Sequence, residues 1–248
     1  MREPRSVVLL GGTSGIGRAL ARKLAERGDR IVLFGRKPEE LERSVQDLRV
    51  RGASKAAWVE CDLRKPESFA SSFDEAQKVL GFFDTVIVTA ARFATQEQLE
   101  RDRELLYELL TVNFTHTVLF CEEAKNRLLA RGGGTLCVLS SVAGERGRKP
   151  VVFYGATKAG LSRYLEGLDH RFRQEGLRVI TIKPGFVKTP MTAGLKPPPF
   201  AAEADEVAEL ILFAIDWGIP VLYVPLVWAP IMSVIRRLPR FVMRRFNF

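Results

Sequence analysis

Short runs of apolar residues alternate along the chain with longer stretches in which apolar residues recur every three or four positions. A short apolar run bounded by turn residues is typical of a buried strand, and the longer spacing indicates an amphipathic helix. Such runs predict strands at residues 6–10, 30–34, 56–60, 85–89, 135–139, 178–182 and 221–224. Between them, the periodicity predicts helices at 15–27, 38–50, 66–80, 97–130, 152–174 and 203–217.

Strands that are apolar throughout and separated by helices predict a parallel sheet covered on both faces. We therefore expect an α/β fold, a single Rossmann-type doubly wound parallel sheet of about seven strands with helices on both faces. No linker long enough to divide two domains appears. We expect one domain over residues 1–225, followed by a basic amphipathic tail over residues 226–248.

Composition is compatible with a large core, because 46% of the 248 residues are hydrophobic. The three cysteines, Cys61, Cys121 and Cys137, are far apart and form no C-x-x-C pair, so neither a disulfide framework nor a metal site is indicated. We expect reduced, buried thiols in a cytoplasmic protein. The segment of residues 1–6 is short and charged, unlike a secretory signal.

The net charge of +9 favours an anionic partner, and much of the excess lies at the C-terminus, where five arginines follow Asp216, the last acidic residue. These arginines are interspersed with the apolar residues Trp228, Ile231, Met232, Ile235, Leu238, Phe241, Phe246 and Phe248. Basic amphipathic segments with aromatic residues bind anionic membrane interfaces, which would place the protein peripherally on the inner face of a membrane. The alternative is that the tail packs on the protein or on a partner subunit. No nucleic-acid motif appears, so we expect no nucleic-acid partner.

The first predicted strand runs directly into a glycine-rich segment that opens the first predicted helix. Glycines let the backbone turn tightly and approach a pyrophosphate, and the helix N-terminus supplies unpaired amides and partial positive charge. This strand–turn–helix context favours dinucleotide binding over a merely structural turn. The candidate contacts are Gly11, Thr13, Ser14, Gly15, Ile16 and Gly17.

The end of the second predicted strand bears on the choice of cofactor. An acidic residue there would bind the ribose hydroxyls of NAD. The chain instead reads Gly35-Arg36-Lys37, and a guanidinium suits a 2′-phosphate. NADP(H) is therefore favoured over NAD(H), the alternative being that Arg36 and Lys37 are ordinary solvated charges.

Tyr154 and Lys158 lie four residues apart in a predicted helix and therefore share one face. A nearby cation favours the phenolate, so we expect Lys158 to lower the pKa of Tyr154 from about 10. A phenol tuned in this way is an effective general acid or base. Ser141 follows the fifth predicted strand, at the edge where open α/β sheets bind ligands.

The spacing of Gly11, Gly15 and Gly17, followed by Ser141, Tyr154 and Lys158, resembles the short-chain dehydrogenase/reductase family. The resemblance implies a nicotinamide-dependent oxidoreductase and a homo-oligomer, either dimer or tetramer. It adds Asn113 to the catalytic set, positioning a water next to Lys158. It also adds as cofactor contacts Asp62, Leu63, Ala90, Ala91, Pro184, Gly185, Val187 and Thr189. The family's asparagines are missing beside Ala90 and Ala91.

In the implied reaction, Tyr154 protonates the oxygen of a carbonyl that receives hydride, Ser141 donates a hydrogen bond to it, and Lys158 holds the nicotinamide ribose. Segments 140–148 and 183–196 resemble a branch of the family that reduces keto-sugars carried on a polyprenyl phosphate. Arg146, Arg148 and Lys149 would then meet the phosphodiester, and Pro197–Pro199 would stiffen a loop over the substrate. The alternatives are an alcohol or ketone dehydrogenase with a small apolar substrate, and a non-catalytic dinucleotide sensor.

Overall fold

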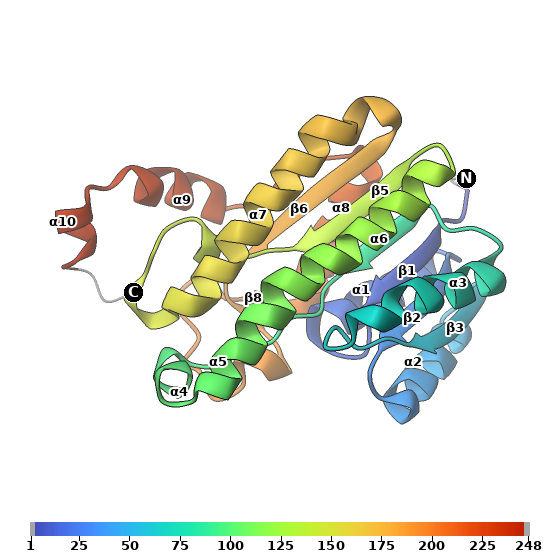
Figure 1. Cartoon of the computed structure of the whole chain (residues 1–248), viewed down its shortest axis with the longest axis horizontal. Helices are drawn as coiled ribbons and strands as arrows, with labels where there is room; N and C mark the ends of the chain where they lie inside the picture. Colours follow the sequence, from blue (N-terminus) through green and yellow to red (C-terminus); the bar gives the residue numbers. More distant parts are fainter. Residues whose placement is uncertain (1–2, 246–248) are drawn as a thin grey trace.

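The computed structural model describes residues 3–245, and its centre is a seven-stranded, wholly parallel sheet (Figure 1). The strand order is β3-β2-β1-β4-β5-β6-β9, so the chain runs outward from β1 to one edge and then returns to build the other half. This is the predicted α/β architecture. The strands are β1 (Ser6–Leu10), β2 (Arg30–Gly35), β3 (Lys55–Glu60), β4 (Thr85–Val88), β5 (Gly134–Leu139), β6 (Leu177–Pro184) and β9 (Val221–Val224).

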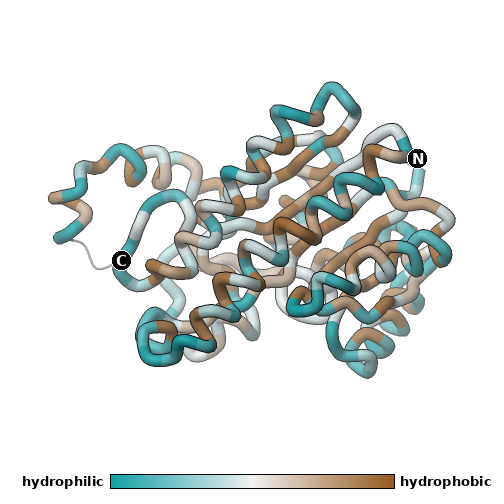
Figure 2. The backbone as a smooth tube through the Cα atoms, viewed as in Figure 1, coloured by the Kyte–Doolittle hydropathy of each residue, from teal (hydrophilic) through white to brown (hydrophobic). Residues whose placement is uncertain are grey.

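Helices cover both faces of the sheet because the strands are apolar on both sides. One core contains α1 (Gly15–Glu26), α2 (Pro38–Val50) and α8 (Ala204–Trp217). The other contains α3 (Phe69–Leu80), α6 (Thr117–Ala130) and α7 (Val152–Phe172). Alternate residues of β1 enter the two cores, Val7 the first and Val8 the second. Figure 2 shows the resulting hydrophobic strands between helices whose outer turns are hydrophilic.

The predicted helical region at 97–130 is interrupted. It consists of α4 (Gln96–Arg101), α5 (Arg103–Leu110), a π-helical turn η2 (Thr111–His116) and α6. Asp102 ends α4 and caps α5, since its Oδ1 accepts a hydrogen bond from the Leu105 amide at 2.9 Å. At the end of the π-helical turn, the hydroxyl of Thr117, the first residue of α6, donates to the carbonyl of Val112, five residues earlier. The predicted third helix similarly begins as a separate 3-10 turn, η1 (Pro66–Ser68).

Shorter elements lie beyond the carboxyl ends of the strands. They are η3 (Val142–Gly144), η4 (Lys149–Val151), η6 (Pro190–Thr192), and the paired strands β7 (Val187–Lys188) and β8 (Ala202–Glu203). The turn η5 (Arg173–Glu175) follows α7 at the other end of the molecule. The pair β7–β8 closes the loop of residues 189–201.

The C-terminal tail forms α9 (Trp228–Arg237) and α10 (Arg240–Met243), which extend to one side of the sheet beside the N-terminus of α7 (Figure 1). Pro230 is the third residue of α9, in the first turn, where its missing N–H is not needed by the helix. Within residues 3–245, no helix has both the length and the apolar composition needed to cross a bilayer. Phe246 and Phe248 lie outside the described residues.

Candidate functional site

A cavity of about 510 Å³ opens at the carboxyl ends of the strands, between the two halves of the sheet. This is where an open α/β sheet leaves a crevice for ligands. Two of the residues predicted for the site, Lys37 and Asn113, do not line the cavity. The others do: Gly11, Thr13, Ser14, Gly15, Ile16, Gly17, Arg36, Asp62, Leu63, Ala90, Ala91, Ser141, Tyr154, Lys158, Pro184, Gly185, Val187 and Thr189.

The glycine turn forms one wall of the cavity out of backbone. A Cβ on Gly17 would overlap the carbonyl oxygen of Gly11, and Gly11 itself has a φ of 93°. Ser14, the N-cap of α1, makes no side-chain capping bond, and the first turn of the helix holds no acidic residue. The first amides of α1 therefore remain available, with the positive end of the helix dipole, to bind a phosphate group.

Arginine side chains surround the cavity at the ends of β2 and β3. Arg36 lines it, whereas Lys37 turns away and pairs with Glu40 at 2.8 Å. Asp62 is held by Arg64, which donates through Nε and Nη2 at 2.9 and 2.7 Å. Burial alone would raise the pKa of Asp62, but the hydrogen bonds from Arg64 outweigh it and hold that pKa below its usual value. Sequence reasoning missed Arg64, although its place just after Asp62 at a strand end was a usable signal.

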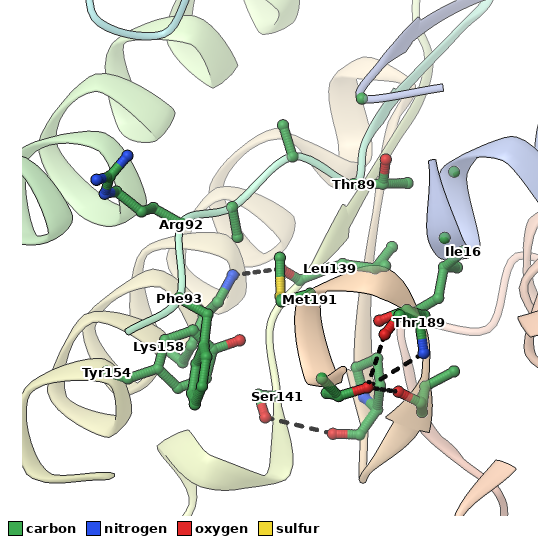
Figure 3. Close-up of a pocket in the computed structure, with 18 of the residues that line it drawn as sticks. Ile16, Thr89, Arg92, Phe93, Leu139, Ser141, Tyr154, Lys158, Thr189 and Met191 are labelled. Atoms are coloured by element: carbon green, nitrogen blue, oxygen red, sulfur yellow. Dashed lines mark hydrogen bonds between the residues drawn. The ribbon is translucent and has the colours of Figure 1, made fainter. Parts of the chain in front are cut away.

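Ser141, Tyr154 and Lys158 meet on the opposite wall. The Ser141 hydroxyl donates to the Pro184 carbonyl at 3.3 Å and accepts from the Ala143 amide at 3.1 Å. The Lys158 Nζ lies 5.7 Å from the centre of the Tyr154 ring and donates to the Leu139 carbonyl at 3.0 Å. Figure 3 shows Tyr154 and Lys158 together with Phe93, facing Ile16 and Thr189 across the cavity.

Burial dominates the electrostatics of this wall. It raises the pKa of Tyr154 to about 12, with the nearby Ser141 hydroxyl acting in the opposite direction. It lowers the pKa of Lys158 to about 8, since an ammonium loses hydration there. The expectation that Lys158 lowers the pKa of Tyr154 below 10 does not hold in this structure. At neutral pH the phenol is protonated, which is the state that a general acid requires.

Asn113 is buried in the π-helical turn, and its side-chain amide makes two hydrogen bonds to the backbone of a single residue. Its Oδ1 accepts from the Arg92 amide and its Nδ2 donates to the Arg92 carbonyl, both at 2.7 Å. The next residue, Phe93, packs edge-on against Tyr154 with ring centres 5.4 Å apart. Asn113 thus fixes the segment that covers Tyr154. Arg92 and Phe93 directly follow the predicted pair Ala90 and Ala91 but were not singled out from sequence.

The remaining wall comes from segments far apart in the chain. The loop of residues 189–201 contributes Met191, Leu195 and Pro198, and α9 contributes Trp228. The indole of Trp228 packs directly on Gly185, so closely that a Cβ on this glycine would overlap the indole nitrogen. Arg148, from the loop between Ser141 and Tyr154, also lines the cavity.

An ion network fixes α9 beside the cavity. The buried carboxylate of Glu145 accepts from Lys183 at 2.6 Å and from the Tyr223 hydroxyl at 2.8 Å, and it pairs with Arg236 at 3.1 Å. Burial alone would raise the pKa of Glu145, but these partners hold it below its usual value. Met232 is also buried. Part of the tail therefore packs on the protein, which was the alternative to membrane binding considered from the sequence.

The three cysteines are buried and free. Burial raises the pKa of Cys61 to about 12, and those of Cys121 and Cys137 also rise. Their thiolates are therefore scarce at neutral pH, as predicted for inert core residues.

A doubly wound sheet whose glycine turn and whose serine, tyrosine and lysine face one cavity defines a dinucleotide-binding oxidoreductase. The family model described as short chain dehydrogenase matches residues 5–199. The chain belongs to the short-chain dehydrogenase/reductase family and is an NAD(P)-dependent oxidoreductase acting on CH–OH or C=O groups.

Characterised and uncharacterised relatives agree with this assignment. The chain is 36% identical to an uncharacterized oxidoreductase of Streptomyces coelicolor, with 98% of this chain and 96% of the relative covered. It is 31% identical to the 3-oxoacyl-acyl-carrier-protein reductase of Aquifex aeolicus, with 76% of each covered. A structure of an actinorhodin polyketide ketoreductase variant with NADPH superposes with a TM-score of 0.80, at 24% identity over 89% of this chain and 95% of the other. That last likeness concerns the fold.

Proposed function

We propose that the protein reduces a ketone with NADPH, using Tyr154 as the general acid. The observation that carries the proposal is the meeting of Ser141, Tyr154 and Lys158 on a cavity that also contains the glycine turn. When bound, the reduced nicotinamide supplies the hydride. Tyr154 gives its proton to the carbonyl oxygen as that oxygen gains charge, and Ser141 donates a hydrogen bond to the same atom. A preorganised donor of this kind contributes roughly 3 kcal/mol in the transition state.

The residues of the cavity suit the dinucleotide from end to end. The uncapped amides at Gly15–Gly17 would hold the pyrophosphate, and Asp62 and Leu63 would flank the adenine. Lys158 would bind the nicotinamide ribose, while Val187 and Thr189 would contact the nicotinamide amide. Ala90 and Ala91 leave room beside the ring. Asn113 acts at one remove, as a positioning residue that holds Arg92 and therefore Phe93 against Tyr154.

The test is Tyr154→Phe, assayed by NADPH oxidation with a panel of ketones. We expect kcat to fall about 1000-fold with little change in the KM for NADPH, because only the proton donor is lost. Tyr164→Phe is the matched control on the same helix, since Tyr164 bonds Glu122 outside the cavity. Equal turnover by Tyr154→Phe and wild type would refute the mechanism. NADPH binding without any turnover would support the non-catalytic sensor instead.

For the cofactor, the proposal is a preference for NADP(H). Gly35 leaves no carboxylate at the end of β2, and Arg36 and Arg64 both line that end of the cavity. Arg36→Gln should raise the KM for NADPH roughly 10- to 100-fold and leave that for NADH nearly unchanged, because a charge-assisted hydrogen bond is lost. Lys37, paired with Glu40, should matter less. Arg43→Gln, on the outer face of α2, is the control. A similar loss with both cofactors would contradict the assignment.

For the substrate, we propose a bulky ketone, of which a polyprenyl-phosphate-linked keto-sugar is the candidate that the sequence favours. Pro198, Leu195 and Met191 bring the loop of residues 189–201 over the cavity, which would suit a large substrate. The competing candidate is a small apolar ketone or alcohol. The ketone panel separates them, since a preference for small neutral ketones would refute the bulky, anionic class.

We further propose a homo-oligomer, dimer or tetramer, as is common in the family. The helical run α5–η2–α6 exposes the apolar residues Tyr107, Leu110, Phe114 and Leu119. Light scattering of a Tyr107→Glu, Leu119→Glu double variant should give a monomer, whereas Val50→Glu on α2 should keep the wild-type mass. A monomeric wild type would refute this.

A second proposal for the tail is contact with an anionic membrane surface. Arg237, Arg240 and Arg244 are exposed together with Val234 and Phe241, each of which is 63% exposed. Co-sedimentation with vesicles containing phosphatidylglycerol should exceed that with neutral vesicles. It should fall at least several-fold in an Arg240→Glu, Arg244→Glu variant but not in the Arg43→Glu, Arg163→Glu control. Equal sedimentation of all three proteins would refute the proposal.

A further inference from the structure

Arg148 stands out among the arginines of the cavity. Within the described residues four arginines line it, and two of these are paired: Arg64 with Asp62 and Arg92 with Glu108. Arg36 lies at the nucleotide end, near the carboxylate of Asp62. The described part of the chain offers the Arg148 side chain neither a hydrogen bond nor an ion pair, and its Nε is buried without a partner.

Arg148 is half-buried, and burying part of a guanidinium without a partner is costly, because the buried nitrogen gives up its hydration and receives nothing in return. The pKa of Arg148 is accordingly lowered by burial, with no acidic group acting on it. Proteins retain such groups where a ligand completes them. The planar fork of a guanidinium matches the two oxygens of a carboxylate or phosphate.

The neighbours of Arg148 explain why it alone faces inward. Arg146 donates to the Leu238 carbonyl at 2.6 Å, and Lys149 donates to the Arg244 carbonyl at 2.8 Å. These two bonds tie the loop to the tail on both sides of Arg148. Of the three basic residues that the sequence offers for a substrate phosphodiester, the structure directs two to the backbone of the tail and leaves one for the cavity.

The position of Arg148 also separates it from the end of the cavity proposed to hold the 2′-phosphate of the dinucleotide. Its loop joins β5 to α7 and lies beside α9, on the opposite side of the molecule from β2 and β3 (Figure 1). Since neighbouring strands are about 4.8 Å apart, the end of β5 is roughly 14 Å from the end of β2, where Arg36 lies. In the chain, Arg148 falls between Ser141 and Tyr154. A second unpartnered donor, the indole Nε1 of Trp228, lines the same cavity.

We propose that Arg148 binds an anionic group of the substrate, a carboxylate or a phosphate, located beyond the reacting carbonyl. The inference rests on the proposed ketone reduction and narrows its substrate class to ketones that carry a negative charge. Carboxylate and phosphate share the chemistry that a guanidinium recognises, so the experiment includes both.

The test compares three aryl ketones of similar size: para-acetylbenzoate, para-acetylphenyl phosphate and the neutral methyl ester of the former. We expect wild type to have a kcat/KM at least about 10-fold higher for one or both anions than for the ester. Arg148→Gln should remove that preference, with a rise of roughly 10- to 100-fold in the KM for the anion and little change in kcat. The kcat/KM for the ester and the KM for NADPH should be unaffected. Arg148→Lys should retain part of the preference.

Arg163→Gln is the matched control, because it removes the same charge from the exposed face of α7. Equal losses for anion and ester, a rise in the KM for NADPH, or a wild type indifferent to charge would overturn the proposal. Calorimetric titration of the NADP⁺-loaded protein with para-acetylbenzoate and para-acetylphenyl phosphate separates this inference from the proposed function. If no ketone is reduced but an anion binds wild type and not Arg148→Gln, ketone reduction fails and the anion site stands. If neither anion binds wild type, the site fails.

Discussion

At the nucleotide end of the cavity the wall is mostly backbone, while at the substrate end it consists of side chains drawn from distant segments. Gly11, Gly15 and Gly17 form the first wall within seven residues of one turn. Arg148 and Trp228, which packs on Gly185, belong to the second, and an ion network around Glu145 holds α9 beside them. The first end is built for a ligand common to a whole family, and the second can change with the sequence of a few loops. The two ends should therefore respond differently to mutation.

Gly17→Ala should have the largest effect. The added methyl group would overlap the Gly11 carbonyl oxygen and approach the Thr89 hydroxyl to 2.6 Å, and a carbonyl of a buried turn cannot move aside cheaply. We expect the Kd for NADPH, measured by fluorescence titration, to rise more than about 100-fold, the equivalent of roughly 3 kcal/mol. Circular dichroism separates this from a failure to fold. Near-normal NADPH affinity would show that the turn is not a rigid cradle.

Glu145→Gln tests the substrate end, and the expected loss of unfolding free energy is similar in size to the binding energy lost in Gly17→Ala. The amide keeps the shape but leaves Lys183 buried without its carboxylate, which costs about 3 kcal/mol of unfolding free energy. Chemical denaturation measures this. The KM for the ketone should rise while the Kd for NADPH stays within about two-fold, because the network holds α9 and not the glycine turn.

Glu166→Gln is the control for that experiment, since its pair with Arg163 is exposed and should contribute less than about 1 kcal/mol. If Glu145→Gln changed NADPH affinity as much as ketone affinity, the two ends of the cavity would not be independent.

Gly185→Ala makes the comparison with Gly17 direct. Here the added methyl group meets the indole of Trp228, a side chain that can rotate and shift α9 outward. Overpacking of this kind typically costs 1–3 kcal/mol, and we expect the lower half of that range in thermal unfolding. A Gly185→Ala, Trp228→Ala double variant should bind NADPH more tightly than Gly17→Ala does. If the double variant were as defective as Gly17→Ala, the loop at Pro184 would be as rigid as the glycine turn.

The sequence predicted the sheet and the glycine turn well, because both depend on local patterns. Each predicted strand lies within two residues of its observed bounds, and the glycine turn joins β1 to α1 as predicted. The substrate end escaped prediction because it depends on contacts between distant residues. Arg146 and Lys149 donate to the carbonyls of Leu238 and Arg244, which leaves only Arg148 for the cavity. The sequence of the loop alone does not indicate which of the three basic residues faces the cavity.

Local patterns also failed where a hydrogen bond outweighs periodicity. The apolar spacing from 97 to 130 continues through Asp102, so only the cap that Asp102 gives to Leu105 reveals the break. Asn113, which the family resemblance assigns to positioning a water next to Lys158, bonds the backbone of Arg92 through its side-chain amide, a contact that no local pattern indicates. The four-residue spacing of Tyr154 and Lys158 correctly placed them together, and yet burial, which no spacing reports, controls both pKa values.

Lys158 is buried in the wall of the cavity beside Tyr154, and its ammonium should leave a signature in the pH dependence of stability. Its pKa is about 8 in the folded protein against the usual 10.5. Between these values the unfolded chain still holds the proton that the folded protein has released, so higher pH favours folding by up to about 1.4 kcal/mol per pH unit. In Lys158→Met this contribution is absent, while Tyr154 and the cysteines titrate in both proteins.

The unfolding free energy of wild type minus that of Lys158→Met should therefore rise by about 2 kcal/mol from pH 8 to pH 10, as measured by urea denaturation. A difference that stays flat over this range would mean that the ammonium keeps its proton in the folded state. The nicotinamide ribose would then meet a fully charged lysine. The wall of the cavity would then contain a permanent positive charge in place of an amine that titrates near pH 8.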